Sequence, residues 1–89
     1  TVMIRVIYHR NFKKGFKKLK NSEQKAFEEQ LSIFIINPTD SVLNNHSLHG
    51  KYLGCRSINI TGDLRVVFEN ISENIAHLLA IDTHSNLYR

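Results

Sequence analysis

The sequence predicts an α+β fold in which two N-terminal helices pack on one face of a mainly antiparallel sheet of about four strands. Three observations support this prediction. A strand-like run opens the chain, two helical periodicities follow it, and three strand-like runs separated by turn residues close it. Segregated strands and helices, here in the order β-α-α-β-β-β, are typical of α+β folds. We expect the first strand beside the last three, giving the sheet a mixed edge.

The whole chain, residues 1–89, is expected to form one domain, because 89 residues are too few for two hydrophobic cores. Hydrophobic residues make up 42% and charged residues 22%, which indicates an ordered globular protein rather than a disordered one. We predict no membrane span and no signal peptide. The single cysteine, Cys55, cannot form an intrachain disulfide, so we expect a cytoplasmic location.

The first strand is predicted over residues 2–8, which are rich in β-branched side chains. A helical period follows over residues 10–19, with Phe12, Phe16 and Leu19 on one side. The opposite side of this helix is basic and carries Arg10, Lys13, Lys14, Lys17 and Lys18.

Positive charge is concentrated in this N-terminal part. The first 20 residues hold seven Lys or Arg and no acid, whereas the whole chain has a net charge of only +4. The basic side of the first helix is therefore a localised patch that could face phosphates. We expect it to bind RNA through Lys13, Lys14, Lys17 and Lys18.

The second helix is predicted from about Glu23 to Ile36, with a cap at Asn21 and Ser22 and with Glu23 in the first turn. Asn37-Pro38 should end it. Its core stripe consists of Phe27, Leu31, Phe34 and Ile35. Gly15 should weaken the first helix, because glycine is a poor helix former.

Residues 39–55 are polar and irregular, and we expect a loop that crosses the end of the sheet. Three strands should follow, over residues 56–60, 64–69 and 75–82. The turns between them are predicted at Thr61-Gly62-Asp63 and Ser72-Glu73-Asn74, which have hairpin turn chemistry.

Two histidines in the loop, His46 and His49, have a spacing that could hold a metal. We favour surface or loop-packing histidines over ligands, because no carboxylate or thiolate lies beside them. A general acid–base role for one of them is as well supported as the structural one.

Arg65 lies within an apolar strand, where its charge needs either a partner or solvent. One interpretation is an ion pair with Asp63, Asp82 or Glu69. The other is a phosphate clamp, because the guanidinium fork matches two phosphate oxygens. Arg56, at the start of the preceding strand, has the same two interpretations.

Asp63 is expected in its turn on structural grounds alone, since aspartate side chains bond turn amides. His77, in the middle of the last strand, is interpreted as structural. His84 follows the end of that strand, close to Tyr88, and is well placed for a cleft. Such residues could cleave RNA without a metal, because the reaction needs a base, an acid and cations for the phosphorane.

Four elements of the C-terminal half, in this order and spacing, resemble the signature of YafQ-type toxins in the RelE superfamily. The N-terminal strand and helices match the layout of that family as well. The elements are His46-x-Leu48-x-Gly50, Gly54-x-Arg56-Ser57-Ile58, Gly62-Asp63-x-Arg65-Val66-Val67-Phe68 and Asp82-Thr83-His84-Ser85-x-Leu87-Tyr88.

The resemblance implies a RelE-like toxin domain that acts as a metal-independent endoribonuclease on translated messenger RNA, generally in the ribosome. It implies no cofactor, a silencing antitoxin, and contact with operator DNA only through that antitoxin. By position, His84 is the favoured proton-transfer group, His46 a second catalytic histidine and Asp63 the turn aspartate. Tyr88 would stack on or position a base. The two arginines, Arg65 and Arg56, match a phosphate-binding and a strand arginine.

One position departs from the family pattern. Asn59 stands where YafQ-type chains often have a second histidine, and an amide cannot shuttle a proton. This departure keeps open a degenerate toxin that acts only as an antitoxin-bound DNA co-repressor. A second alternative is a non-catalytic ParE-like toxin, against which the presence of His46, Asp63, His84 and Tyr88 argues. A third is a plain RNA-binding module that uses the lysines of the first helix.

Overall fold

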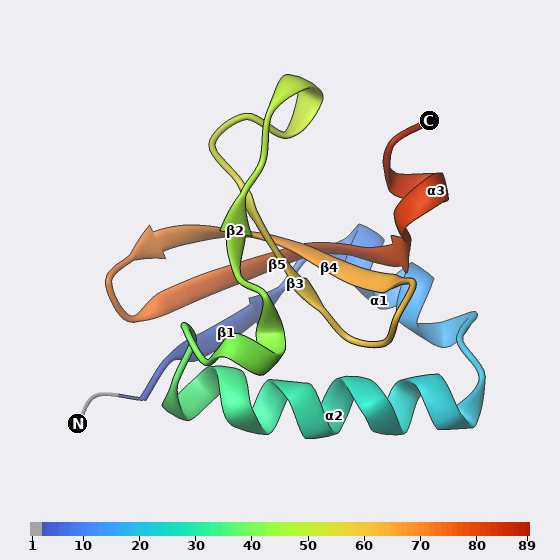
Figure 1. Ribbon diagram of the computed structural model, residues 1–89, viewed down its shortest axis with the longest axis horizontal. Helices are drawn as coiled ribbons and strands as arrows, with labels where there is room; N and C mark the ends of the chain where they lie inside the picture. Colours follow the sequence, from blue (N-terminus) through green and yellow to red (C-terminus); the bar gives the residue numbers. More distant parts are fainter. Residues whose placement is uncertain (1–2) are drawn as a thin grey trace.

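The computed structural model of the protein describes residues 3–89 and contains one five-stranded sheet with its helices (Figure 1). The strands and longer helices follow the predicted order. In chain order the elements are β1 (Arg5–Tyr8), α1 (Arg10–Lys17), α2 (Asn21–Ile36), η1 (Ser41–Leu43), β2 (His46–Ser47), η2 (Gly50–Tyr52), β3 (Arg56–Asn59), β4 (Leu64–Ser72), β5 (Ile75–Thr83) and α3 (His84–Leu87).

The strand order across the sheet is β1-β5-β4-β3-β2. β1 pairs with β5 in parallel, and all other neighbours are antiparallel, which confirms the predicted α+β fold with a mixed edge. The fifth strand is the two-residue β2, which the sequence pattern assigned to a loop. The predicted start of the first strand, Val2, lies outside the described residues.

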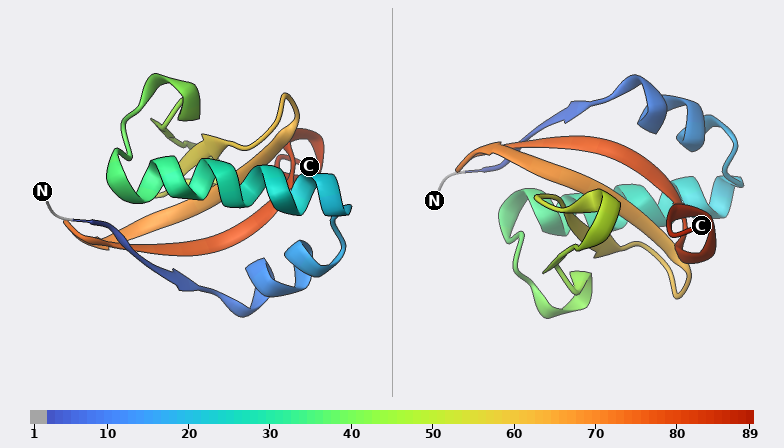
Figure 2. Two further views of the ribbon diagram at one scale, coloured as in Figure 1. Left: turned by 90° about the horizontal axis from the view of Figure 1, so that it is seen from below. Right: turned by 90° about the horizontal axis from the view of Figure 1, so that it is seen from above.

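α2 lies across one face of the sheet and α1 lies beside β5, at the edge where β1 ends, and both helices contribute side chains to the core on that face (Figure 2). Phe12 of α1 and Phe27 and Phe34 of α2 are nearly fully buried against alternating residues of the central strands. Aromatic rings bury a large apolar area each, so these three side chains contribute strongly to the packing of the helices. The sheet residues of this core are Ile58, Ile60, Leu64, Val66, Phe68, Ala76, Leu78 and Ile81.

Gly15 allows α1 to approach β5 closely. A Cβ at this position would lie 2.8 Å from the carbonyl oxygen of Ile81, closer than real Cβ atoms come to a backbone atom. The glycine predicted to weaken the helix is thus what permits this contact, and its low helix propensity is offset by packing.

The start of α2 differs from the prediction. The N-cap is Lys20, and Asn21 is the first helical residue, so the predicted cap at Asn21 and Ser22 is wrong. The Glu23 carboxylate accepts the Lys20 backbone N–H at 3.0 Å, as an acid in the first turn can. The predicted end at Asn37-Pro38 is confirmed, because α2 ends at Ile36.

A smaller apolar cluster lies on the other face of the sheet, which we call the open face. Leu48, Val67 and Leu87 are buried there, with Tyr52 and Cys55 packed against them. A bulge in β5 turns both Leu79 and Ala80 toward this cluster. Within residues 3–89, no helix is both long enough and apolar enough to span a membrane.

Candidate functional site

Two segments stand on the open face. The chain from β2 through η2 rises above the sheet, and so does α3 with the C-terminus, on the side opposite to α2 (Figure 1). Leu48 from the first segment and Leu87 from α3 pack on Val67 of β4. Side chains that lie far apart in sequence are therefore held over the same part of the sheet.

His84 and Tyr88 meet at the short helix α3. The Thr83 side chain caps this helix by accepting the Asn86 N–H at 3.2 Å, and the His84 backbone N–H donates to the Asp63 carbonyl at 2.9 Å. One helical turn separates the two rings, whose centroids are 4.8 Å apart. The predicted closeness of His84 and Tyr88 is confirmed.

Tyr52, from η2, belongs to the same group and was missed by the sequence analysis. Its ring packs edge-on against Tyr88, with centroids 5.7 Å apart and planes at 86°. Beside it, the Lys51 ammonium donates to the Arg89 carbonyl at 3.3 Å. One hint of this role was present in the sequence, because Tyr52 is an aromatic residue in the same polar segment as His46.

Arg65 completes the group, and we call Tyr52, Arg65, His84 and Tyr88 the open-face cluster. The Arg65 guanidinium donates to the carbonyls of Thr61 and Gly62 at 3.0 Å each, and to its neighbour Leu64 at 3.3 Å. Among residues 3–89 it makes no ion pair with a carboxylate, so the interpretation of Arg65 as the ionic partner of Asp63, Asp82 or Glu69 is wrong. The turn carbonyls orient the guanidinium, and its positive charge is not neutralised.

The neighbours of Tyr88 in the open-face cluster affect the pKa of its phenol. Burial raises the pKa of its phenol above the ordinary value, the Tyr52 phenol raises it further, and Arg65 lowers it. Tyr88 therefore keeps its proton at neutral pH. In this state it can donate a hydrogen bond or stack on a ring.

The β3–β4 turn lies beside the cluster. Its amides, those of Asp63 and Leu64, are bonded by the Thr61 hydroxyl rather than by the Asp63 carboxylate, which is exposed. Asn59 faces Arg65 across β3 and β4, and its side-chain oxygen is buried without a hydrogen-bond partner. Such an atom lowers stability, and a histidine ring at this position would adjoin the same arginine.

His46 and Arg56 lie at the far side of the sheet. β2 is three strands from β5, which corresponds to about 14 Å between their backbones. The His46 ring is exposed and its Nδ1 lies 2.7 Å from the Asn44 carbonyl, while Arg56 donates to the Asn45 side chain at 2.7 Å. Among residues 3–89, neither side chain has a hydrogen bond or a ring contact with the open-face cluster.

The other loop histidine, His49, is exposed beside a hollow of about 310 Å³ that Arg56 and Cys55 also line. Burial raises the pKa of the Cys55 thiol, as does the charge of Glu69. No three His, Cys, Asp or Glu side chains within residues 3–89 are arranged to hold a metal ion.

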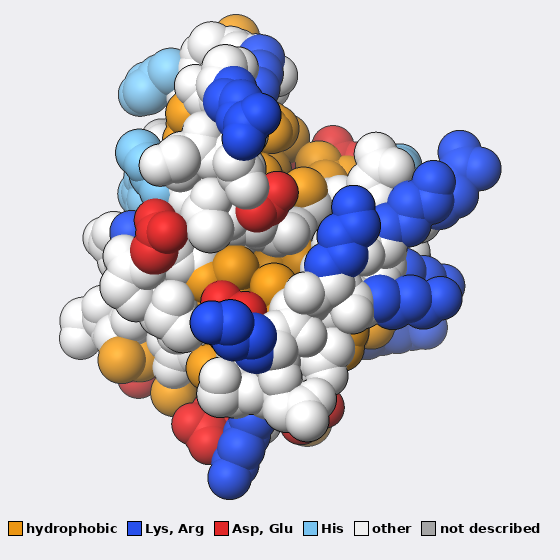
Figure 3. Space-filling view, turned by 90° about the vertical axis from the view of Figure 1, so that its right-hand side faces the viewer, with side chains coloured by type: hydrophobic (Ala, Val, Ile, Leu, Met, Phe, Trp, Pro, Cys, Tyr) orange, Lys and Arg blue, Asp and Glu red, His pale blue; other side chains and the backbone are white. Residues whose placement is uncertain are grey.

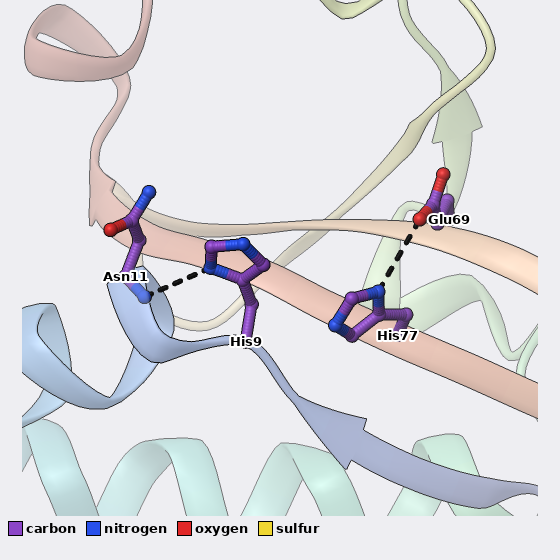
Figure 4. Close-up of polar contacts among 4 residues, drawn as sticks. All are labelled: His9, Asn11, Glu69 and His77. Carbon is purple, nitrogen blue, oxygen red and sulfur yellow. Dashed lines mark hydrogen bonds and ion pairs between the residues drawn. The ribbon is translucent and has the colours of Figure 1, made fainter.

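Two further histidines form a separate polar group at the other end of β5 (Figure 4). His77 Nδ1 lies 3.3 Å from a Glu69 carboxylate oxygen, and the His9 and His77 ring centroids are 5.5 Å apart. His9 Nδ1 accepts the Asn11 N–H at 2.9 Å and so caps α1. His77 thus has a carboxylate partner, in line with its interpretation as structural.

Lysine and arginine side chains gather to the right in the space-filling view (Figure 3), and the lysines of α1 are exposed. α1 packs with the helix-side core, whereas the open-face cluster packs on the opposite face of the sheet. The lysine group and the open-face cluster are thus carried by elements on opposite faces. The lysines concerned are Lys13, Lys14, Lys17 and Lys18.

A family model and several solved structures match the chain. A family model described as "Bacterial toxin of type II toxin-antitoxin system, YafQ" matches residues 4–89. The crystal structure of YafQ from E. coli strain BL21(DE3) superimposes with a TM-score of 0.80 at 17% identity, covering 97% of this chain and 99% of that one. None of the curated proteins matches the chain.

Two complexes contain similar chains. In the E. coli DinJ-YafQ toxin-antitoxin complex, the matching chain has a TM-score of 0.78 and 16% identity, with 99% of this chain and 100% of that one covered. In the archaeal RelE-RelB complex from Pyrococcus horikoshii OT3, the values are 0.72 and 21%, with 92% and 96% covered. At these identities the likeness establishes the shared fold.

Proposed function

Since the chain belongs to the YafQ family of toxins of type II toxin–antitoxin systems, we propose that it is a metal-independent endoribonuclease that cleaves translated messenger RNA at the ribosome. The observation that carries the proposal is the grouping of His84, Tyr88 and the unneutralised Arg65 on the open face. Acid–base cleavage of RNA needs a proton-transfer group, a base-positioning group and a cation, and these three side chains supply them.

The reaction transfers two protons. The 2′-hydroxyl loses one as its oxygen attacks phosphorus, and the departing 5′-oxygen gains one as the P–O5′ bond breaks, leaving a 2′,3′-cyclic phosphate. Imidazole can donate or accept a proton near neutral pH, and His84 is exposed on a fixed backbone, so we assign it one of these transfers. The Asp63 carboxylate, exposed in the turn that holds the His84 N–H, is our candidate for the other.

Arg65 has the position and charge to stabilise the phosphorane. The carbonyls that bind it fix the plane of the guanidinium before RNA arrives, so little reorganisation is needed as negative charge develops. Tyr88, protonated at neutral pH, would stack on the base next to the cleaved bond or donate to a phosphate oxygen.

The remaining predicted residues act at a greater distance in this proposal. Arg56 would bind a flanking phosphate, and the α1 lysines would attract RNA through long-range electrostatics. A direct proton transfer by His46 at the same phosphate requires β2 to move toward α3 when RNA binds, because β2 lies about 14 Å from β5, the strand before α3, although Tyr52 of η2 already packs against Tyr88.

An antitoxin is the proposed protein partner, since similar chains are found with DinJ and RelB in toxin–antitoxin complexes. Binding of operator DNA would occur through that antitoxin. The alternative of a catalytically degenerate co-repressor draws support from Asn59, whose buried amide oxygen occupies the place of a family histidine.

A ribosome cleavage assay tests the proposal. The purified protein is added to ribosomes stalled on a defined transcript, in magnesium buffer with a zinc-selective chelator, and the cut sites are mapped by primer extension. We expect cleavage that the chelator does not change. A folded protein that leaves the transcript intact, or cleavage that stops in chelator and returns with zinc, would contradict the proposal.

A further inference from the structure

Arg65 and Asp82 carry opposite charges and stand opposite each other on neighbouring strands. They are register partners in the antiparallel pair of β4 and β5. Ile81 points into the helix-side core, so Asp82, the next residue along the strand, points to the open face, as Arg65 does. Side chains in such positions have Cβ atoms about 4.5–5.5 Å apart, and an opposite-charge pair there is ordinarily stabilising. Nevertheless, Arg65 makes no ion pair within residues 3–89.

Hydrogen bonds draw the Asp82 carboxylate toward α3 instead. Its Oδ1 accepts the Thr83 backbone N–H at 2.7 Å and the Asn86 side-chain amide at 3.0 Å. Thr83 ends β5, and Asn86 lies in α3, which follows β5 directly (Figure 1). The negative charge that stands opposite Arg65 is therefore bound to the start of the next element.

The side chain of Asn86 is itself held in one orientation. Its Oδ1 accepts a hydrogen bond from the Arg89 guanidinium at 2.8 Å, so its Nδ2 is the atom that faces Asp82. A guanidinium has only donors and a carboxylate only acceptors, so an amide between them fits in this orientation alone. The Asn86 backbone N–H is also bonded, to the Thr83 hydroxyl at 3.2 Å.

A second set of hydrogen bonds holds Arg65 on its own side. The guanidinium donates to the carbonyls of Thr61 and Gly62 at 3.0 Å each. These acceptors are neutral, and a hydrogen bond between a guanidinium and a carboxylate is stronger than one to a neutral group. The separation of Arg65 from Asp82 therefore depends on both sets of bonds, and the amide of Asn86 belongs to the set that holds the carboxylate.

We propose that Asn86 is a positioning residue of the open-face cluster, which holds the Asp82 carboxylate at α3 and so keeps the charge of Arg65 free for a phosphate group. Without the amide of Asn86, the Asp82 carboxylate pairs with Arg65 and neutralises it. The consequence for RNA cleavage rests on the proposed function, whereas the consequence for the charge of Arg65 does not.

A structural role for Asn86 alone predicts a different outcome. α3 spans only His84–Leu87, and so short a helix depends on bonds at its ends. If Asn86 served only to hold α3, its loss would impair the protein whatever residue stood at position 82. If it acts through Asp82, removal of the Asp82 charge should undo the damage.

Four variants separate these roles. Asn86→Ala removes the amide, and Asp82→Asn removes the charge but keeps an oxygen that can accept the Thr83 N–H. D82N/N86A combines the two substitutions. Ser85→Ala is the matched control, because Ser85 is exposed on the same helix. Asn86 is exposed as well, so all four proteins should fold, and thermal melts check this.

The charge of Arg65 can be measured without RNA. Burial raises the pKa of the Tyr88 phenol and Arg65 lowers it, so neutralisation of Arg65 in Asn86→Ala should raise this pKa further, as followed by NMR of the Tyr88 ring. The Arg65 side-chain N–H resonances report the binding of inorganic phosphate, which should weaken about tenfold in Asn86→Ala. Both quantities should return to the parent values in D82N/N86A.

Cleavage on ribosomes should follow the charge of Arg65. Asn86→Ala should lower the single-turnover rate by roughly 10- to 100-fold, less than the full loss of a transition-state donor, because Arg65 stays in place. Asp82→Asn, D82N/N86A and the Ser85→Ala control should cut at close to the parent rate.

Three results would overturn the proposal. One is a D82N/N86A protein as impaired as Asn86→Ala, and another is an Asn86→Ala protein with unchanged phosphate binding and an unchanged Tyr88 pKa. The third is loss of cleavage in Asp82→Asn alone, since the carboxylate would then act in the reaction itself. A parent protein that cuts no RNA, with the expected changes in phosphate binding and in the Tyr88 pKa, would refute the proposed function and leave the role of Asn86 intact.

Discussion

Replacing His84 by alanine should abolish most cleavage while leaving the fold nearly unchanged. The side chain is exposed, and the hydrogen bond from its backbone N–H to the Asp63 carbonyl does not depend on the ring. The lost contact with the Tyr88 ring costs at most about 0.5–1.5 kcal/mol, and alanine returns part of this as a better helix former. The free energy of unfolding should therefore fall by about 1 kcal/mol or less.

The expected loss of activity is far larger. Removal of a general acid or base lowers a rate by roughly 10²- to 10⁴-fold, which corresponds to about 3–5 kcal/mol in the activation free energy. The assay is single-turnover cleavage of a defined transcript on ribosomes, with thermal melts of the same preparations. His49→Ala is the matched control, because His49 is also an exposed histidine but lies outside the open-face cluster. If His84→Ala cut as fast as the control, the assignment of proton transfer to His84 would be wrong.

Three further predictions concern the open-face cluster, the approach of α1 and alkaline stability. Tyr52→Ala should weaken the binding free energy for RNA by about 1–3 kcal/mol, because the ring would no longer stack on a base. Tyr52→Phe keeps the ring and should bind RNA like the parent protein. Equal affinities of the parent and both variants in an anisotropy titration would exclude stacking. Gly15→Ala should lower the free energy of unfolding by up to about 2 kcal/mol in urea titrations, because overpacking against the Ile81 carbonyl outweighs the gain in helix propensity. A variant more stable than the parent would refute the close approach of α1 to β5. The pKa values of Cys55 and Tyr88 are raised in the folded protein, so the unfolded chain loses these protons first as the pH rises. The free energy of unfolding should therefore be at its full value below about pH 9. It should decline as the pH passes the ordinary pKa of the thiol and then that of the phenol, first because of Cys55 and then because of Tyr88. Urea midpoints that stay constant from pH 8 to 11 would contradict it.

The fold could largely be predicted from the sequence because its main determinants are local. The change from strand to helical period, the Asn37-Pro38 stop and the two hairpin turns mark the elements within a few residues. Two local predictions were wrong for identifiable reasons. The cap of α2 shifted to Lys20 because Glu23 bonds that residue's N–H, and residues 46–47 became a strand because β3 offers a free edge to them.

The open-face cluster was harder to predict because it depends on contacts between distant segments. His84 and Tyr88 are one helical turn apart, so their closeness follows from local structure. Tyr52 is 36 positions from Tyr88 and meets it only because both segments pack on Val67. Likewise, no sequence rule indicates that turn carbonyls rather than a carboxylate would hold Arg65.

The chemistry of the cut ends tests the central claim most directly. Transcripts cleaved on the ribosome are compared with transcripts that carry a single 2′-deoxy nucleotide on the 5′ side of the cut. The account predicts 2′,3′-cyclic phosphate or 3′-phosphate ends, and no cleavage at the deoxy position, because the 2′-oxygen is the nucleophile. Cleavage of the deoxy transcript at the normal rate, with 3′-hydroxyl ends, would contradict acid–base catalysis by the open-face cluster.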